Sequence, residues 1–327
     1  MPDALNCVSL LGALSESSAK SDVGKIPENR PSYSTSRTKH SLCFQLRSLC
    51  WRALTNANLI CDAFHTLASP AYVEVWMRNP RLCVKYLFED YLARGFTPRQ
   101  SIACLVHHYR RLKTVFPAVP LRKILNENVV LHRTLHHGSL LALTIGLSRN
   151  CDKEGELSLI LKIDNLVICT LAFTIIPGWV VGIDAAETIL ISRLQGAAGS
   201  YPQQIRVAAG AFHGVQPRQL LMSAVEGIAI ALKIGEVTSV PSVRQSSFSE
   251  EFAETFDRNY DRFFGAFGMK RLSSGFWRAE VPIWVKPMSD VKSSHRSTAK
   301  RRRAVKGQVR GACAEVLCGS NAPTMLT

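Results

Sequence analysis

No apolar run in the sequence is long enough to cross a membrane. The most apolar stretches, residues 157–177 and 220–234, are interrupted by Lys162, Asp164 and Glu226, whereas a membrane-spanning helix needs about 20 predominantly apolar residues. A secretory signal is not expected either, because Asp3 stands where such a signal carries Lys or Arg. We therefore expect a cytoplasmic protein without a transmembrane segment.

The short motifs of several common enzyme classes are also missing. The chain contains no GxSxG elbow, P-loop, HExxH or dinucleotide fingerprint. The sequence therefore lacks the motifs that usually indicate a hydrolase or a nucleotidase. None of the ten cysteines forms a CxxC pair, and the closest two are Cys313 and Cys318. Most cysteines lie in apolar periodic segments, which is typical of reduced core thiols, and we predict no metal site.

Positive charge is concentrated near the two ends of the chain. The net charge is +15, and residues 286–310 hold nine Lys or Arg against one acid, whereas residues 53–285 hold 24 against 19. We predict a Ser-rich disordered leader at residues 1–40 and a basic flexible tail at residues 288–327. The tail residues that are candidates for binding anionic lipid or nucleic acid phosphates are Lys300, Arg301, Arg302 and Arg303. A solvated tail without a ligand is the alternative.

The spacing of apolar residues predicts a helical region over residues 41–135. Helical periodicity covers residues 42–54, 72–77, 82–92 and 98–115, and the last of these helices opens with Thr97 as N-cap before Pro98.

Residues 136–287 have the pattern of an α+β domain. Four strands are predicted in SLLALTIGLSRN, GELSLILKIDN, LVICTLAFTII and AETILISRL, with Asp164 and Asn165 as a tight hairpin turn. After Gly196 come a helix from Pro217, a short strand at 237–240, an aromatic helix opened by a capping box at Ser247, and a last strand or two within 276–285. The fold class is therefore α+β, with a helical region followed by a mostly antiparallel sheet and packed helices.

Several segments together resemble the VirK/YbjX family of bacterial proteins. They are NPRLCVKYLFEDYLARGFTPRQSIACLVHHYRRL, EGELSLIL, ISRLQG, AFHGVQPRQLL, NYDRFFGAFG and HRSTAKRRR, in the family's order. The chain departs from the family where Val207 and the two alanines after it replace a threonine-lysine pair, and where Phe263 and Phe264 replace a Trp. The resemblance implies links to virulence, to envelope integrity or surface-protein display and to tolerance of antimicrobial peptides, at times with attachment to the inner membrane, and it assigns no molecular activity.

A second resemblance concerns the end of the fourth predicted strand. Arg193, Gln195, Gly196 and Ala198 match the [RQ]xxGx[GA] pattern by which acyltransferases of the GNAT type approach the pyrophosphate of coenzyme A. The later helix is similar to the one in which such enzymes often carry the tyrosine that protonates the departing thiolate, and Tyr260 holds the matching position. This resemblance implies acyl-CoA as cofactor and a GNAT-like core.

The alternative interpretation of these residues is purely structural, with a strand-to-helix turn at Gly196 and an aromatic core around Tyr260. Residues 201–216 also separate the glycine motif from the long helix. If the start of that helix bound the phosphates, it would be expected to follow the glycine motif directly. Three functions stay open from sequence: an accessory protein without an assigned activity, an acyl-CoA-dependent acyltransferase, and non-specific binding of nucleic acid or anionic lipid through the basic tail.

Overall fold

The structure of the protein is a computed structural model that describes residues 55–80, 84–87, 90–149, 152–196 and 202–319. Contacts divide the chain into Met1–Gln45 and Leu46–Thr327, and all described residues belong to the second unit. The predicted leader, residues 1–40, lies outside the described residues.

Helices come first in the described chain, as the sequence predicts. They are α3 (Ala57–Leu67), α4 (Pro70–Arg78), α5 (Pro98–Val115) and α6 (Ala118–Asn126). The predicted start of α5 is confirmed, because the Gln100 backbone N–H donates to Thr97 Oγ1 over 3.2 Å and the Gln100 side chain accepts from the Thr97 N–H over 2.9 Å. Two satisfied backbone donors thus fix the first turn.

The helix predicted over residues 82–92 is wrong in its described part. The segment holds one short 3-10 turn, Lys85–Leu87, and Leu92 has a φ of +63°, in the left-handed region that an α-helix cannot contain. Lys85 and Tyr91 instead turn their side chains toward the buried carboxylate of Glu156. Tertiary pairing of a buried charge has overridden the local apolar spacing.

One eight-stranded sheet follows, with the strand order β1-β2-β3-β4-β5-β6-β8-β7. The strands are β1 (Val129–His136), β2 (Ser139–Leu147), β3 (Leu157–Ile163), β4 (Leu166–Pro177), β5 (Glu187–Gly196), β6 (Glu236–Ser239), β7 (Lys270–Arg271) and β8 (Trp277–Glu280). All neighbours pair antiparallel except β5 and β6, which are parallel. The α+β class is thereby confirmed.

The four predicted strands appear as β2 to β5, and the sheet also contains β1, which the sequence placed in the helical region. Asp164 and Asn165 form the predicted turn between β3 and β4, with Asp164 at a φ of +53° and its Oδ1 accepting from the Leu140 N–H over 2.9 Å. β1 is an edge strand with one well-buried residue, Leu131. An edge strand packed so lightly shows little apolar alternation, so its sequence does not indicate a strand.

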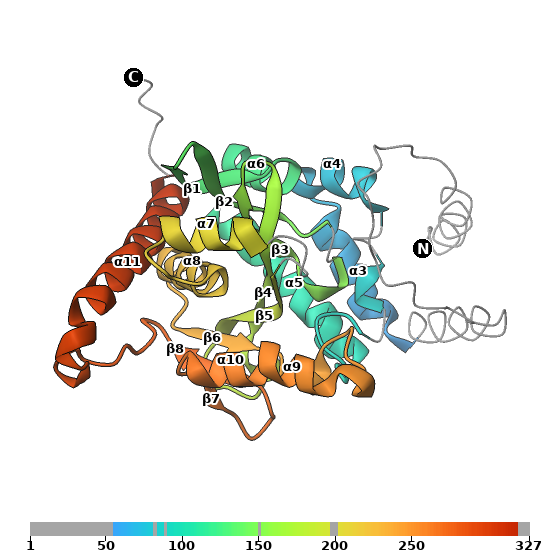
Figure 1. Ribbon diagram of the computed structural model, residues 1–327. Helices are drawn as coiled ribbons and strands as arrows, with labels where there is room; N and C mark the ends of the chain where they lie inside the picture. Colours follow the sequence, from blue (N-terminus) through green and yellow to red (C-terminus); the bar gives the residue numbers. More distant parts are fainter. Residues whose placement is uncertain (1–54, 81–83, 88–89, 150–151, 197–201, 320–327) are drawn as a thin grey trace. The chain divides into compact units, whose positions relative to one another are not determined.

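Helices cover both faces of the sheet. Figure 1 shows α7 (Pro202–Ala211), α8 (Pro217–Leu232) and α11 (Arg296–Gly319) on one side, and α3 and α5 on the other. α8 is the predicted apolar helix, and most of its residues are buried. It ends at Lys233, whose left-handed backbone provides the C-cap.

The predicted aromatic helix is divided into shorter pieces. A 3-10 turn, Glu250–Phe252, leads into α9 (Ala253–Asn259), and α10 (Asp261–Ala266) follows after a break at Tyr260. Ser249, not Ser247, is the N-cap residue of that turn, and no side chain caps it. The predicted capping box is therefore not formed.

The segment predicted as a basic flexible tail contains the long helix α11, which packs on α8. Val305, Val309, Cys313 and Leu317 recur every four residues and are buried. Gly227 of α8 lets the helices approach closely, since a Cβ there would lie 3.0 Å from the Cys313 Cβ. In the part of the chain that the structure describes, no helix combines the length and apolar character that crossing a bilayer requires.

Candidate functional site

The parallel strands β5 and β6 separate halfway along β5. Their register runs from Ile189 opposite Val237 to Ile191 opposite Ser239, and the Val240 N–H donates to the Ile191 carbonyl over 3.0 Å. β5 continues beyond this point to Gly196, paired with β4 alone. Along its last five residues β5 therefore has one edge paired with β4 and one edge that β6 does not cover.

A β-bulge lies at the point of separation. β4 advances by one residue, from Ala172 to Phe173, while β5 goes from Arg193 to Ile191, so Ser192 is the extra residue. The Ser192 Oγ is buried and has no hydrogen-bond partner among the described residues. The Oε1 of Gln245, in the turn after β6, is buried and unpaired in the same sense. Orphaned buried polar atoms are uncommon in native proteins, so these two are unusual features of this part of the sheet.

Tyr260 brings a phenol to this open edge of β5. It occupies the break between α9 and α10 and is 7% exposed. Burial, together with the charge of Glu154, raises the pKa of Tyr260 to about 12, although Arg193, Arg218 and a hydrogen bond from the Leu194 backbone lower it. Tyr260 is therefore protonated at neutral pH and has a proton to donate.

Both chain neighbours of Tyr260 are held in place. Asn259 Oδ1 accepts from the two terminal nitrogens of Arg218, each over 3.2 Å. Asp261 accepts from Ser242 and, over 2.8 Å, from the indole N–H of Trp277. These contacts tie the helix break to α8 on one side and to the turn after β6 on the other, which fixes the position of the phenol.

Arg193 contacts both Gln195 and the loop before β3. The Arg193 guanidinium forms an ion pair with Glu154 and a hydrogen bond with the Gln195 side chain. Ser246 Oγ donates to the other oxygen of Glu154 over 2.7 Å. The side chains of Arg193 and Gln195 are therefore engaged within the protein.

Arg218, which the sequence did not single out, is the cation beside Gly196. A Cβ on Gly196 would lie 3.9 Å from the Arg218 Nε. The sequence feature that could have indicated Arg218 is its position in the first turn of α8, because the helix dipole disfavours a cation there. The sequence does not indicate Glu154 either, because an acid in a loop does not stand out until the fold brings it to Tyr260. Ala198 lies outside the described residues.

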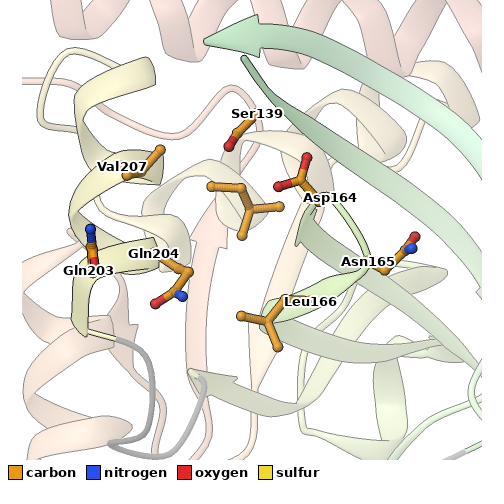
Figure 2. A pocket seen from close by; sticks show the side chains of 8 residues that line it. Ser139, Asp164, Asn165, Leu166, Gln203, Gln204 and Val207 are labelled. Carbon is orange, nitrogen blue, oxygen red and sulfur yellow. The ribbon is translucent and has the colours of Figure 1, made fainter. Parts of the chain in front are cut away.

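A cavity of about 640 Å³ lies past the end of β5, between α7 and the β3–β4 turn. Figure 2 shows Gln203, Gln204 and Val207 of α7 on one side, and Asp164 of the turn and Leu166 of β4 on the other. The end of β5 is close by in register, because Gly196 pairs with Cys169, three residues after Leu166. The volume is within the range of small-molecule sites, about 300 to 1,000 Å³.

Comparison with known proteins confirms the first resemblance. The chain is 25% identical over 232 residues to "Uncharacterized protein YbjX" of Escherichia coli (strain K12), a match that covers 69% of this chain and 68% of that protein. No solved structure matches the chain significantly. The family model "Protein of unknown function (DUF535)" matches residues 34–315, and the chain therefore belongs to this family, to which the VirK/YbjX proteins are assigned.

Proposed function

We propose that the protein is an acyl-CoA-dependent acyltransferase with a GNAT-like sheet. The observation that carries the proposal is the bulge at Ser192, where the parallel strands β5 and β6 separate beside Tyr260. An open strand edge binds an extended ligand through backbone hydrogen bonds. The pantetheine arm of coenzyme A is extended and carries two amide groups, so it suits this edge.

The residues around the edge fit such a cofactor. Arg218 places a guanidinium beside Gly196, where a pyrophosphate would lie, and Ser192 offers a buried hydroxyl in need of a partner. The stretch that separates Gly196 from α8 contains α7, which starts at Pro202. α7 is therefore the helix that follows the glycine motif, and the cavity at its first turns would receive the nucleotide end of the cofactor.

Tyr260 and Glu154 supply the chemistry. In the transfer, a bond forms between the acceptor nitrogen and the acyl carbon while the carbon–sulfur bond breaks. Glu154 accepts the proton that the acceptor loses. Because its pKa of about 12 is above the value of about 8.5 for a thiol, Tyr260 stabilises the departing thiolate as a hydrogen-bond donor, and the acceptor's proton then completes the thiol.

Calorimetric titration with acetyl-CoA and longer acyl-CoA tests the binding. We expect heat with the unmodified protein and little with Gly196→Glu, whose carboxylate would take Arg218 and repel phosphate. The matched control is Gly235→Glu, in the exposed loop between α8 and β6, where a Cβ meets no atom within 4 Å. Absence of heat with the unmodified protein, or equal heat with both variants, refutes the proposed site.

Release of free thiol tests the role of Tyr260. Tyr260→Phe keeps the ring packing but removes the donor, so we expect unchanged acyl-CoA affinity and a fall in turnover of about 10²-fold to 10³-fold, as for the loss of an oxyanion donor. Unchanged turnover would contradict the assignment.

For the biological setting, we propose the bacterial envelope, as the VirK/YbjX resemblance implies. An enzyme that acylates an envelope component would connect the activity with surface display, virulence and tolerance of antimicrobial peptides. A deletion strain should lose peptide tolerance, and the unmodified gene but not the Tyr260→Phe variant should restore it. Restoration by the variant would separate the phenotype from acyl transfer.

A further inference from the structure

A second cavity lies against α5, on the opposite side of the sheet from α7 and α8 (Figure 1). Its volume is about 490 Å³, which is within the range of small-molecule sites. One face of α5 forms its floor from Arg99 to Thr114, because the lining residues of the helix recur at steps of three and four. α3 contributes Leu59, and the 3-10 turn after β4, Gly178–Val180, contributes Trp179. The cavity thus has its floor on one helix and its walls on two other elements.

The 3-10 turn holds Trp179 in solvent at one wall of this cavity. Trp179 is 53% exposed. The backbone of the turn is tightly packed, since a Cβ on Gly178 would collide with the Ala185 carbonyl oxygen. The Gln100 side chain donates to the Val180 carbonyl over 3.4 Å, which ties the turn to the start of α5. A well-fixed turn therefore exposes a large aromatic ring, and a flat ligand would cover that ring by stacking.

Three arginines and one acid, Asp62, line the cavity. Arg110 pairs with Asp62, and Arg111 pairs with Glu187. Arg99 is exposed, and within the described ranges of the chain no hydrogen bond or ion pair engages it. Arg99 does not stabilise the helix either, because it lies in the first turn of α5, where the helix dipole disfavours a cation. No contact among the described residues therefore accounts for Arg99, whereas an external anion would give its guanidinium a partner.

Arg99 and Trp179 belong to the same end of the cavity. Their immediate neighbours in the chain, Gln100 and Val180, are hydrogen-bonded to each other. Arg110 lies eleven residues further along α5, about 16 Å away at a rise of about 1.5 Å per residue. One end of the cavity thus presents an aromatic ring and an unpaired cation, which is the combination that recognises a planar ring joined to an anionic group.

We propose that this cavity binds a nucleoside monophosphate, with the base stacked on Trp179 and the phosphate held by Arg99. Every base has a flat face that stacks on an aromatic side chain, and a guanidinium matches a phosphate with two parallel N–H donors. The cavity is separate from the open edge of β5, so the proposal is independent of acyl transfer.

Calorimetric titration of the full chain with adenosine monophosphate tests the proposal. Arg99→Gln should weaken binding about 10-fold to 100-fold, because a hydrogen bond from a charged donor is lost. Trp179→Ala should weaken it at least about fivefold, because base stacking is lost. The matched control is Arg110→Gln at the other end of the same floor, an exposed and already paired cation, which should change the affinity less than about threefold.

Ligands that lack one group separate the two contacts. Ribose 5-phosphate, which has no base, should bind the unmodified protein and Trp179→Ala equally, and adenosine, which has no phosphate, should bind the unmodified protein and Arg99→Gln equally. Gly196→Glu should leave the binding of adenosine monophosphate unchanged, which distinguishes this cavity from the proposed acyl-CoA site. Absence of binding, loss of binding in Gly196→Glu but not in Trp179→Ala, equal losses in Arg99→Gln and Arg110→Gln, or equally strong binding of benzoate would each overturn the proposal.

Discussion

Replacing Lys85 by Met should destabilise the protein by about 3 to 5 kcal/mol, because it leaves the buried carboxylate of Glu156 without its cation. Glu156 is 0% exposed and Lys85 1%, and Lys85 Nζ lies 2.8 Å from Glu156 Oε2. The N–H groups of Lys85 align with no acceptor among the described residues. The contact is therefore mainly an attraction between charges, and Met at this position keeps the volume while it removes the charge.

For Lys85→Met we expect a loss of stability in the lower half of this range. The hydroxyls of Tyr91 and Tyr109 donate to the two oxygens of Glu156, the second over 2.7 Å, and both remain in the variant. Since natural domains are stable by about 5 to 15 kcal/mol, even 3 kcal/mol is a large share. The destabilisation should also disturb the candidate site, because Glu154 lies two residues before Glu156 and pairs with Arg193.

Urea unfolding in a double-mutant cycle with Glu156→Gln measures the effect. Lys85→Met/Glu156→Gln should lose less than the sum of the single variants, by at least about 2 kcal/mol, because it leaves no unpaired charge. The control is Arg78→Met, which breaks the pair with Glu74, 63% and 45% exposed, and should cost less than about 0.5 kcal/mol. A loss below about 1 kcal/mol for Lys85→Met, or additive losses, would refute the reasoning.

Two further predictions concern stability. Gly227→Ala should cost about 1 to 3 kcal/mol in urea unfolding by forcing α11 away from α8, whereas Gly311→Ala, where a Cβ on α11 meets no atom within 4 Å, should be neutral or stabilising; equal effects would contradict the close contact. Burial, with the charges of Lys85 and His107, holds the pKa of His108 well below 6.5, so below about pH 6.5 the unfolded chain binds a proton that the folded chain does not. Stability should fall there by up to about 1.4 kcal/mol per pH unit, and His108→Asn, which can still accept from the Ile175 N–H, should reduce that slope; identical slopes in urea titrations would count against it.

The strands of the central sheet could be predicted because their side chains alternate or run apolar along the chain. Asp164 and Asn165 could be placed in a turn for the same local reason, as these residue types tolerate the left-handed backbone. Tyr260 could be chosen through its resemblance to a known motif. Its environment could not, because Glu154, Arg193 and Arg218 come from three separate elements.

The remaining misses have physical causes. α11 carries a readable row of apolar residues at steps of four, but the surrounding arginines indicated solvent exposure more strongly. The segment around Lys85 has the spacing of a helix, and the buried carboxylate that prevents the helix lies about 70 residues further along the chain. Pairing at such distance leaves no periodic signal in the sequence.

Hydrogen exchange of the protein with and without acyl-CoA tests the central claim most directly. Ligand at the open edge of β5 should protect the backbone amides of residues 192–196 and of the turn at 242–245, and should leave β1 and β2 unchanged. Binding that protects neither segment, or protection confined to the opposite face of the sheet at α3 and α5, would contradict the assignment of this edge as the cofactor site.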